Sequence, residues 1–518
     1  MRLSRRAALT GAAGLWAASL VSSCSSLRIP SDPFTLGVAS GDPLADAVVI
    51  WTRLAPDPLH GGGMPPQAVE VEWQVASDER MQRLVRRGTA FADPNFAHSV
   101  HVDVQGLEPA RWYWYRFTVG GYASPIGRTR TAAANRLDRL RLAFASCQHY
   151  EHGYYTAYRH MAREDLDLVL HLGDYIYEYS AAGTPQAAQR PRLQPPGLAK
   201  TLADYRALYA TYKSDPDLQA AHAACPWIVT WDDHELENDY ANDSGQERTP
   251  PLRFLQQRAA AYQAYWEHMP LRLAQRPSGP DARLYRRFSF GDLIELNVMD
   301  GRQYRSPLPC PRPPEEKNRA RLVEPAACPE HAAAERSIWG AAQERWLLDG
   351  LVRSPAQWNV IAQQVLMAGL DQKPGRGRAL WTESWDAFPA ARHRLMSVLA
   401  ERRVANPVVL TGDIHSFWAN DLKLDYESPG ARAVATEFVC TSISSQGVPH
   451  DQFAAFLPEN PHIRFMDARW RGYGTCTVER DRWSTVFRAV DSVLDRQAGI
   501  RDLAAFVTES GRPGTVSA

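Results

Sequence analysis

The sequence predicts an α/β domain preceded by a small all-β domain, and two observations support this division. Residues 34–131 contain short apolar runs separated by turn residues. Residues 139–500 instead alternate apolar strands with helical stretches, the order that packs helices against β-sheets. At 518 residues, 45% of them hydrophobic, the chain is long enough to bury one large core and a smaller one.

Residues 1–30 are typical of an export signal rather than of a folded element. An SRR sequence precedes an apolar run at 7–21, which is too short to span a bilayer comfortably. Paired arginines at this place predict the twin-arginine route, which carries folded proteins. The run ends in VSSC, an imperfect lipobox, so two alternatives stay open: Cys24 is lipidated and attaches the protein to a membrane, or cleavage nearby leaves it discarded or inert. We expect a periplasmic, extracellular or lipid-anchored protein.

The charge balance gives no reason to expect nucleic-acid binding. The sequence has 58 basic and 58 acidic residues. A chain that starts at Cys24 loses three arginines, so its net charge is 55 − 58 = −3. Nucleic-acid-binding proteins usually carry a basic surplus on one face. We therefore expect no nucleic-acid-binding surface.

Residues 34–131 predict a β-sandwich of the immunoglobulin or fibronectin type. The runs AVVIWTRL, VEVEWQVA, HSVHVDVQGL and RWYWYRFTVG have the length and spacing of its strands. Polar and apolar residues alternate clearly in VEVEWQV and HVDV. Such domains more often support a neighbouring site than carry chemistry, so no site residue is predicted here.

After a linker at 129–139, the pattern predicts α/β layers. Residues 180–198 are rich in Ala, Gln, Pro and Arg and indicate an insertion. The predicted helices are 199–213, 251–268, 341–352 and 384–402. The predicted strands are 140–147, 166–174, 225–233, 292–300, 357–366, 406–415 and 436–444.

The cysteines predict one loop disulfide. Cys310 and Cys328 flank a Pro-rich, charged stretch, where a disulfide would restrict the unfolded chain. Cys440 and Cys476 lie in strand-like runs and either pair or stay in the core. Cys225 is expected to be buried.

Polar residues with metal-ligand chemistry stand where the predicted strands end. Ligands of α/β sheets bind at the carboxyl edge of the strands, so we expect these side chains to converge. A single Gly-Asp after a strand is more often a turn, but the repetition favours a site. The residues are Cys147, Asp174, Asp232, Asp233, His234, Asp300, Gln363, Gln364, Asp413 and His415.

Two of these motifs are especially dense in possible ligands. WDDHE (231–235) places three acids and an imidazole in four positions, which would repel strongly unless a cation or a substrate balanced them. The alternative is a solvated loop. In GDIH, Asp413 and His415 are two residues apart, so on an extended chain they would point the same way as a ligand pair.

The ordered motifs ASCQ, GDYIYE, TWDDHE, EHMPLR, MDGRQYR and TGDIHSFW resemble the PhoD-like alkaline phosphatases. The resemblance spans about 34–490. It implies a metallophosphoesterase-like β-sheet sandwich flanked by helices, and hydrolysis of phosphate monoesters or diesters. The opening Asp-x-His of most metallophosphoesterases is absent, and Gln363 and Gln364 replace their usual histidine, with no role assigned.

The resemblance also implies Fe³⁺ with Ca²⁺ in the site. It makes Cys147 and Tyr177 iron ligands, with Asp174 bridging metals. Thiolate and phenolate are strong donors to a trivalent ion, whereas calcium prefers carboxylate and amide oxygens. Without the motifs, a core thiol and a packed aromatic ring are the alternatives for the first two residues. The remaining predicted ligands are Asp233, Asn242, Asp413 and His415.

The implied reaction is in-line attack on phosphorus by a metal-bound hydroxide or oxide. We expect His234 to contact the phosphoryl group or the departing oxygen, while Asp233 binds metal, since neighbours on an extended chain point to opposite sides. Arg272 and Arg302 are candidates for gripping phosphate, or else form structural ion pairs. Two alternative functions remain: a phospholipase D-type phosphodiesterase acting on lipid diesters, and an inactive exported binding protein.

Overall fold

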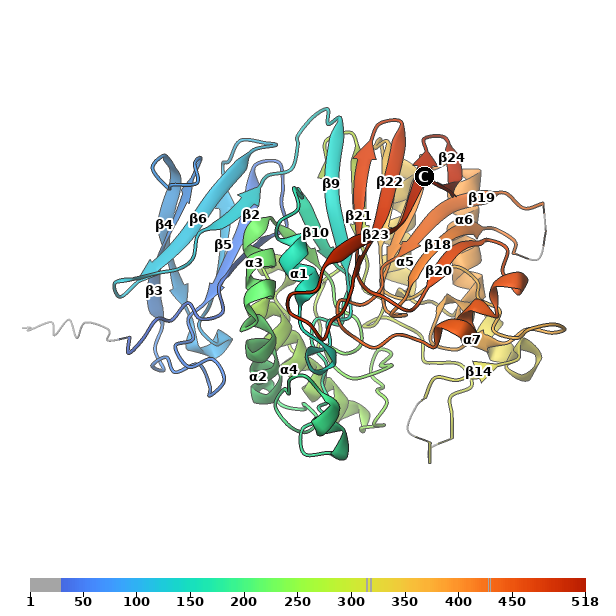
Figure 1. Cartoon of the computed structure of the whole chain (residues 1–518), viewed down its shortest axis with the longest axis horizontal. Helices are drawn as coiled ribbons and strands as arrows, with labels where there is room; N and C mark the ends of the chain where they lie inside the picture. Colours follow the sequence, from blue (N-terminus) through green and yellow to red (C-terminus); the bar gives the residue numbers. More distant parts are fainter. Residues whose placement is uncertain (1–28, 314, 317–318, 427, 429) are drawn as a thin grey trace, which may run out of the picture.

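The computed structural model describes residues 29–313, 315–316, 319–426, 428 and 430–518. The twin-arginine segment and Cys24 lie outside the described residues. Figure 1 shows the N-terminal strands (blue) at one end of an elongated molecule and the two larger sheets beside them.

The molecule is built on a ten-stranded mixed sheet that packs against a seven-stranded one. The first has the order β24 (Arg512–Ser517), β23 (Ile500–Glu509), β22 (Arg482–Val490), β21 (Arg471–Glu479), β9 (Arg139–Ala145), β10 (Leu168–His171), β11 (Trp227–Val229), β1 (Val38–Gly41), β2 (Ala47–Arg53), β5 (Ser99–Gln105). The second has the order β12 (Arg286–Phe290), β13 (Ile294–Val298), β15 (Trp358–Ala362), β17 (Pro407–Thr411), β19 (Ala433–Val439), β18 (Phe417–Lys423), β20 (Ile463–Asp467).

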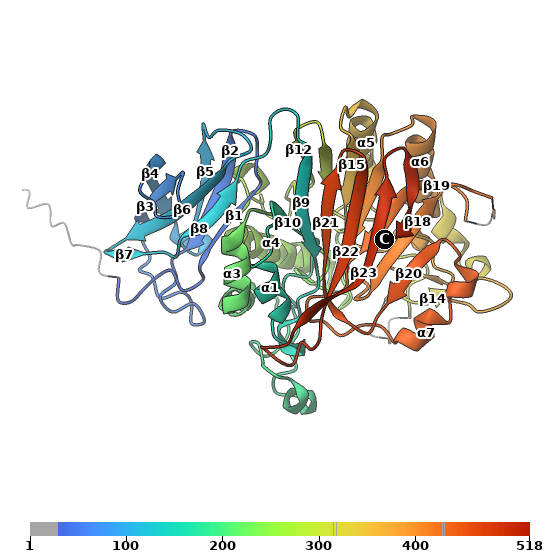
Figure 2. The ribbon, with the colours of Figure 1, turned by 45° about the horizontal axis from the view of Figure 1, so that its top comes forward.

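Helices cover the outer faces of both sheets, as Figures 1 and 2 show. The ten-stranded sheet is covered by α1 (Thr156–Met161), α2 (Leu202–Lys213), α3 (Pro216–Ala224) and α4 (Pro251–His268). The seven-stranded sheet is covered by α5 (Gly340–Arg353) and α6 (Pro389–Glu401), and α7 (His450–Ala454) packs near β20. The four predicted helices correspond to α2, α4, α5 and α6 and are confirmed.

Side chains alternate between the two faces of each strand, so the large domain has three apolar core layers: one between the sheets and one between each sheet and its helices. In β9, Leu142 and Phe144 point into the core between the sheets, whereas Ala143 and Ala145 face the helices. Both faces are therefore buried, which explains the nearly continuous apolar runs of the central strands. Burial of a side chain such as Phe144 contributes roughly 1.5–3 kcal/mol. The predicted metallophosphoesterase-like layering is confirmed.

The N-terminal domain is a β-sandwich that shares a sheet with the large domain. Its second sheet consists of β4 (Leu84–Ala92), β3 (Val69–Ala76), β6 (Trp112–Val119), β7 (Tyr122–Ala123) and β8 (Gly127–Arg130). Its first sheet continues into the large domain, because β1 lies parallel to β11 and Gly41 pairs with Trp227. A Cβ on Gly41 would lie 2.6 Å from the Trp227 carbonyl oxygen, so only glycine permits this approach.

The structure settles one predicted boundary and the state of the two predicted cysteine pairs. The boundary at residue 500 is too early, because β23 and β24 complete the ten-stranded sheet. Cys310 and Cys328 form the predicted disulfide. Cys440 and Cys476 are unpaired and buried in the core, as is Cys225.

A further two-stranded sheet joins β14 (Leu322–Val323) to β16 (Leu380–Trp381).

Candidate active site

The carboxyl ends of the parallel strands from both sheets meet at one place. In the first sheet, β9, β10 and β11 run parallel; in the second, β13, β15, β17 and β19 do. The loops that follow these strands touch: the Cys147 N–H donates to the Gly173 carbonyl, and the Thr230 hydroxyl donates to the Met299 carbonyl. The strand ends of the two sheets therefore meet at one edge, as the sequence predicted.

The first side-chain group contains the predicted iron ligands. One ligand atom each of Cys147, Asp174 and His415 lies within 4.8 Å of the others. The Tyr177 hydroxyl lies 2.9 Å from Asp174 Oδ2 and 3.1 Å from His415 Nε2. His415 Nδ1 lies 2.7 Å from the Gln446 carbonyl oxygen and so carries the proton, which leaves Nε2 free as a ligand atom.

Two further groups adjoin the first one. Asp232, Asp233 and Asp413 form one group, and Asp174, Asp233 and His234 form the other, each with ligand atoms within 4.8 Å of one another. Asp174 and Asp233 each belong to two groups, so the three groups form one continuous cluster. A carboxylate shared in this way is placed to bridge two cations, as expected for Asp174.

The backbone of the cluster is left-handed where the sequence suggested extended chain. Cys147, Asp174, Asp413 and His415 have φ angles of 61°, 56°, 64° and 55°. Each such residue costs about 1–3 kcal/mol, and this kind of strain concentrates at functional sites. The preceding Gly173 has φ 111°, and a Cβ there would lie 2.5 Å from the Asp232 Cβ.

The turned backbone corrects two directional expectations. Asp413 and His415 do not form a pair on an extended strand, because they belong to different groups of the cluster. Asp233 and His234 do not point to opposite sides either: the chain turns after Trp231, with Leu236 N–H donating to the Asp233 carbonyl, and both side chains reach Asp174.

Arg302 lies inside the cluster, but it is not placed to bind phosphate. Its side chain is fully buried and forms ion pairs with Asp232 and Glu383. Its Nη2 also lies 3.4 Å from Asp233 Oδ1 and 3.7 Å from Asp413 Oδ1. The expectation that Arg302 makes a bidentate contact with the substrate is therefore wrong. Arg302 instead balances the negative charge of the buried carboxylates.

Arg272 and Asn242 contact none of the clustered side chains. Arg272 pairs with Asp103 of β5 and donates to the Asp42 carbonyl, 2.8 Å away, so it joins the two domains. Asn242 is exposed, and its side-chain oxygen lies 3.4 Å from an Arg258 nitrogen. The predicted phosphate contact of the first residue and the predicted calcium ligation by the second are not supported by this geometry.

His234 is held by a carboxylate that the sequence analysis did not single out. His234 Nδ1 lies 2.7 Å from Glu178 Oε2, and the other Glu178 oxygen accepts the Asn238 N–H at 2.8 Å. Nδ1 is occupied, so Nε2 is the ring nitrogen left to face the cluster. The Tyr177 ring stacks on the imidazole, with centroids 4.2 Å apart. The signal in the sequence was the Glu that closes GDYIYE.

Three further residues that the sequence analysis did not predict as structural hold the loops of the site in place through hydrogen bonds and ion pairs. Glu235 accepts the N–H groups of Asp174, Tyr175 and Asp232, so this acid of WDDHE is structural. The Ser445 hydroxyl bonds the Cys147 carbonyl. Glu383 pairs with Arg302 from a loop with no periodic pattern to reveal it.

Gln363 and Gln364 are structural rather than ligands. Gln364 Nε2 donates to the carbonyls of Trp231 and Met299 and so ties the two sheets together. Gln363 Nε2 donates to the Val365 carbonyl, and its oxygen accepts from the Trp385 indole. The two glutamines, to which the sequence analysis assigned no role, thus hold backbone carbonyls at the place where most metallophosphoesterases have a histidine.

The chemistry of the cluster fits bound cations. Burial, and then neighbouring acids, raises the pKa of the Cys147 thiol, the Tyr177 phenol and the Asp413 carboxyl well above their ordinary values. Their anionic forms therefore need a nearby positive charge. Asp233 Oδ1 is buried and accepts no hydrogen bond from the described residues. Thiol, phenol, imidazole and carboxylates together suit a trivalent ion beside harder divalent ones.

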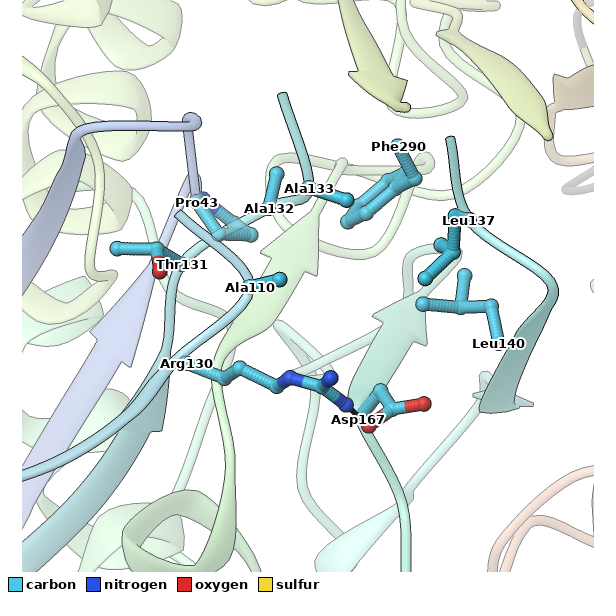
Figure 3. A pocket seen from close by; sticks show the side chains of 10 residues that line it. All are labelled: Pro43, Ala110, Arg130, Thr131, Ala132, Ala133, Leu137, Leu140, Asp167 and Phe290. Carbon is cyan, nitrogen blue, oxygen red and sulfur yellow. Dashed lines mark hydrogen bonds and ion pairs between the residues drawn. The ribbon is translucent and has the colours of Figure 1, made fainter. Parts of the chain in front are cut away.

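A cavity far from this cluster is not a competing site. Figure 3 shows it between the N-terminal domain and the start of β9, with Arg130 and Asp167 paired at its side. Its volume is about 10 Å³, room for about one water molecule. No predicted site residue lines it.

Comparison with known proteins now identifies the family. The model of the PhoD-like phosphatase family matches residues 142–487, and the model of its N-terminal domain matches residues 19–133. The chain belongs to the PhoD-like phosphatase family. It is thus a hydrolase of phosphoric esters, and the resemblance drawn from the motifs is confirmed.

Two relatives within this family match almost the whole chain. Alkaline phosphatase D of Bacillus subtilis (strain 168) is 47% identical over 489 residues, covering 93% of this chain and 82% of the relative. A solved structure of PhoD superposes with a TM-score of 0.88 at 46% identity, covering 95% of this chain and 93% of that one. The fold and the order of the domains therefore match those of PhoD.

We predict that Arg302→Met destabilises the protein and weakens its metal binding. Removing one partner from a buried ion-pair network costs about 3–5 kcal/mol, because the remaining charges stay buried and unpaired. The free energy of unfolding and the metal content measure both effects. Arg272→Met is the matched control and should keep metal content and kcat. Equal metal content and stability in Arg302→Met and wild type would contradict the assigned role.

Proposed function

We propose that this chain is an exported, metal-dependent phosphoesterase that hydrolyses phosphate monoesters or diesters at the cluster described above. The observation that carries the proposal is the continuous group of thiol, phenol, imidazole and carboxylate side chains at the junction of the two sheets. The family assignment adds the class of reaction.

Fe³⁺ and Ca²⁺ are the ions that we propose for this cluster. Cys147, Tyr177, Asp174 and His415 would hold the iron, because they supply the thiolate, phenolate and imidazole donors. Asp233 and Asp413 would hold calcium, with Asp232 beside them. When bound, the ions supply positive charge that offsets the phosphate and lowers the pKa of a water molecule.

His234 is the residue that we propose to act on the substrate. Its Nε2 faces the cluster, so it is placed to donate a proton to the departing oxygen or to hold the phosphoryl group. Glu178 fixes the ring by accepting the Nδ1 proton. Burial opposes the charged imidazole, but Glu178, Asp174 and Asp233 raise the pKa of His234 above its ordinary value.

The choice between monoesters and diesters depends on the loops around the cluster. Residues 180–198 pack against it through Gln194, which donates to the Tyr177 carbonyl at 2.8 Å. A phospholipase D-type diesterase is the second candidate and needs the same cluster with a wider entrance. The inactive-binding-protein alternative finds no support, because the candidate ligands are intact.

We propose export by the twin-arginine route, on the basis of the N-terminal sequence alone. Among the described residues, no helix is both long enough and apolar enough to cross a membrane. Membrane attachment would then depend on lipidation of Cys24, which stays a proposal.

Metal analysis combined with hydrolysis assays tests the proposed function. Protein purified without added metal should contain iron and be coloured, and Cys147→Ser should lose both the colour and most activity, while Cys225→Ser keeps both. EGTA should abolish turnover and calcium, rather than magnesium, should restore it, because flexible oxygen coordination suits the larger ion. Assays on a monoester and a diester give the preferred class. A colourless, zinc-only, fully active enzyme would contradict the proposed metals.

We predict that His234→Ala retains its metals but slows turnover by roughly 10²–10⁴-fold, the usual range for losing a proton-transfer group. The loss should be smaller for esters with good leaving groups. Glu178→Gln should lower kcat about 10–100-fold, because the imidazole loses its orienting carboxylate. Glu237→Gln, which changes a buried acid in the turn that carries His234, is the control. A metal-free His234→Ala variant would show that the assigned role is wrong.

A further inference from the structure

A cavity of about 470 Å³ lies where the N-terminal domain meets α2, and no residue of the metal cluster lines it. The loop after β2 and the turn before β5 form one wall, and Ala203, Arg206 and Ala207 of α2 form the other. Small-molecule sites usually have volumes of roughly 300–1,000 Å³ and often lie between domains. The proposed function gives this cavity no role.

A buried arginine presents one free nitrogen to this cavity. Arg53 is 3% exposed and lines the wall at the end of β2. Its Nε donates to the Ala97 carbonyl at 2.9 Å, and its Nη1 donates to His268 Nε2 at 2.8 Å, since His268 Nδ1 donates to a carbonyl. Among the described residues, Nη2 has no hydrogen-bond acceptor and Arg53 has no ion-pair partner. A Cβ on Gly62, which also lines the cavity, would lie 3.3 Å from Nη2.

The wall carries more positive than negative charge. Arg206 lines it too, and its Nε and Nη2 hold the buried Glu267 carboxylate, which leaves Nη1 without an acceptor in the described part of the chain. Burial lowers the pKa of Arg53 to about 10 although Glu267 opposes the shift, so Arg53 stays charged at neutral pH. One acid therefore serves two guanidinium groups, and none of the residues that line the cavity is acidic.

The rest of the lining is mostly apolar. Leu54, Leu59, Met64 and Pro94 contribute to it, and Leu59 is 50% exposed. An apolar wall that also contains unpaired guanidinium N–H groups suits a ligand with an apolar body and an anionic group. Guanidinium groups bind the paired oxygens of carboxylates and phosphates particularly well.

We propose that this cavity binds a small molecule in which a carboxylate or a phosphate is attached to an apolar group. Arg53 Nη2 and Arg206 Nη1 would donate to the oxyanion, and the apolar wall would cover the remainder. An oxyanion there would offset the charge of Arg53, which has no carboxylate of its own. The cavity is separate from the metal cluster, so this inference does not depend on the proposed function.

Isothermal titration calorimetry with octanoate and with octylphosphonate tests the site, and the neutral octanamide is the control ligand. An anion should bind in the millimolar range or tighter, and octanamide at least about tenfold more weakly, the usual effect of losing a charged hydrogen bond. Arg53→Met removes the donor, and Ala203→Phe fills the cavity from an exposed position of α2. Both variants should weaken binding at least about tenfold. Arg345→Met and Ala220→Phe, at exposed positions of α5 and α3 outside the cavity, are the matched controls.

Binding of only one of the two anions would support the site and identify the anionic group as a carboxylate or a phosphate. Ala203→Phe decides if Arg53→Met does not fold. Three results would overturn the proposal: neither anion binds, octanamide binds as tightly as the anions, or Ala203→Phe binds them as tightly as Ala220→Phe does. The last result would place any bound octylphosphonate elsewhere, such as at the metal cluster, which neither of these two variants changes.

Discussion

The repulsion among buried carboxylates at the junction of the two sheets is the constraint on which the rest of the structure depends. Asp232, Asp233 and Glu383 are nearly inaccessible to solvent, and they surround the fully buried Arg302. Arg302 and Arg305, which also pairs with Glu383, cannot balance these acids together with Asp174 and Asp413, so all five carboxylates stay ionised only if further positive charge is present. Bound cations would supply the positive charge that the carboxylates of the cluster lack.

The two sheets provide the stiffness that this arrangement needs. Parallel strands covered on both faces hold their carboxyl ends in register, and Gln364 ties the two edges together through the Trp231 and Met299 carbonyls. The strained left-handed residues sit directly on these ends, where the packed strands can hold them. Carboxylates such as Glu235 then take up the backbone N–H groups of the loops. The fold thus contributes to fixing the positions of the ligands.

The sequence was sufficient for those parts of the site that follow from strand order. Cys147, Asp174 and His415 could be brought together because the carboxyl ends of successive strands share an edge. It was not sufficient where loops turn: with a left-handed backbone at both residues, Asp413 and His415 belong to different groups of the cluster. Arg302 was expected to reach substrate, since the sequence does not reveal that Glu383 encloses it. Arg272 lies in a motif of the family but serves the contact between domains, which no local pattern shows.

Anomalous diffraction from crystals of protein purified without added metal is the most direct test of the central claim, that this cluster is a binding site for several cations. Data collected on both sides of the iron absorption edge should place an iron peak among Cys147, Asp174, Tyr177 and His415. Lighter cation density should lie beside Asp233 and Asp413. A site without metal, or iron bound only elsewhere on the chain, would contradict the account.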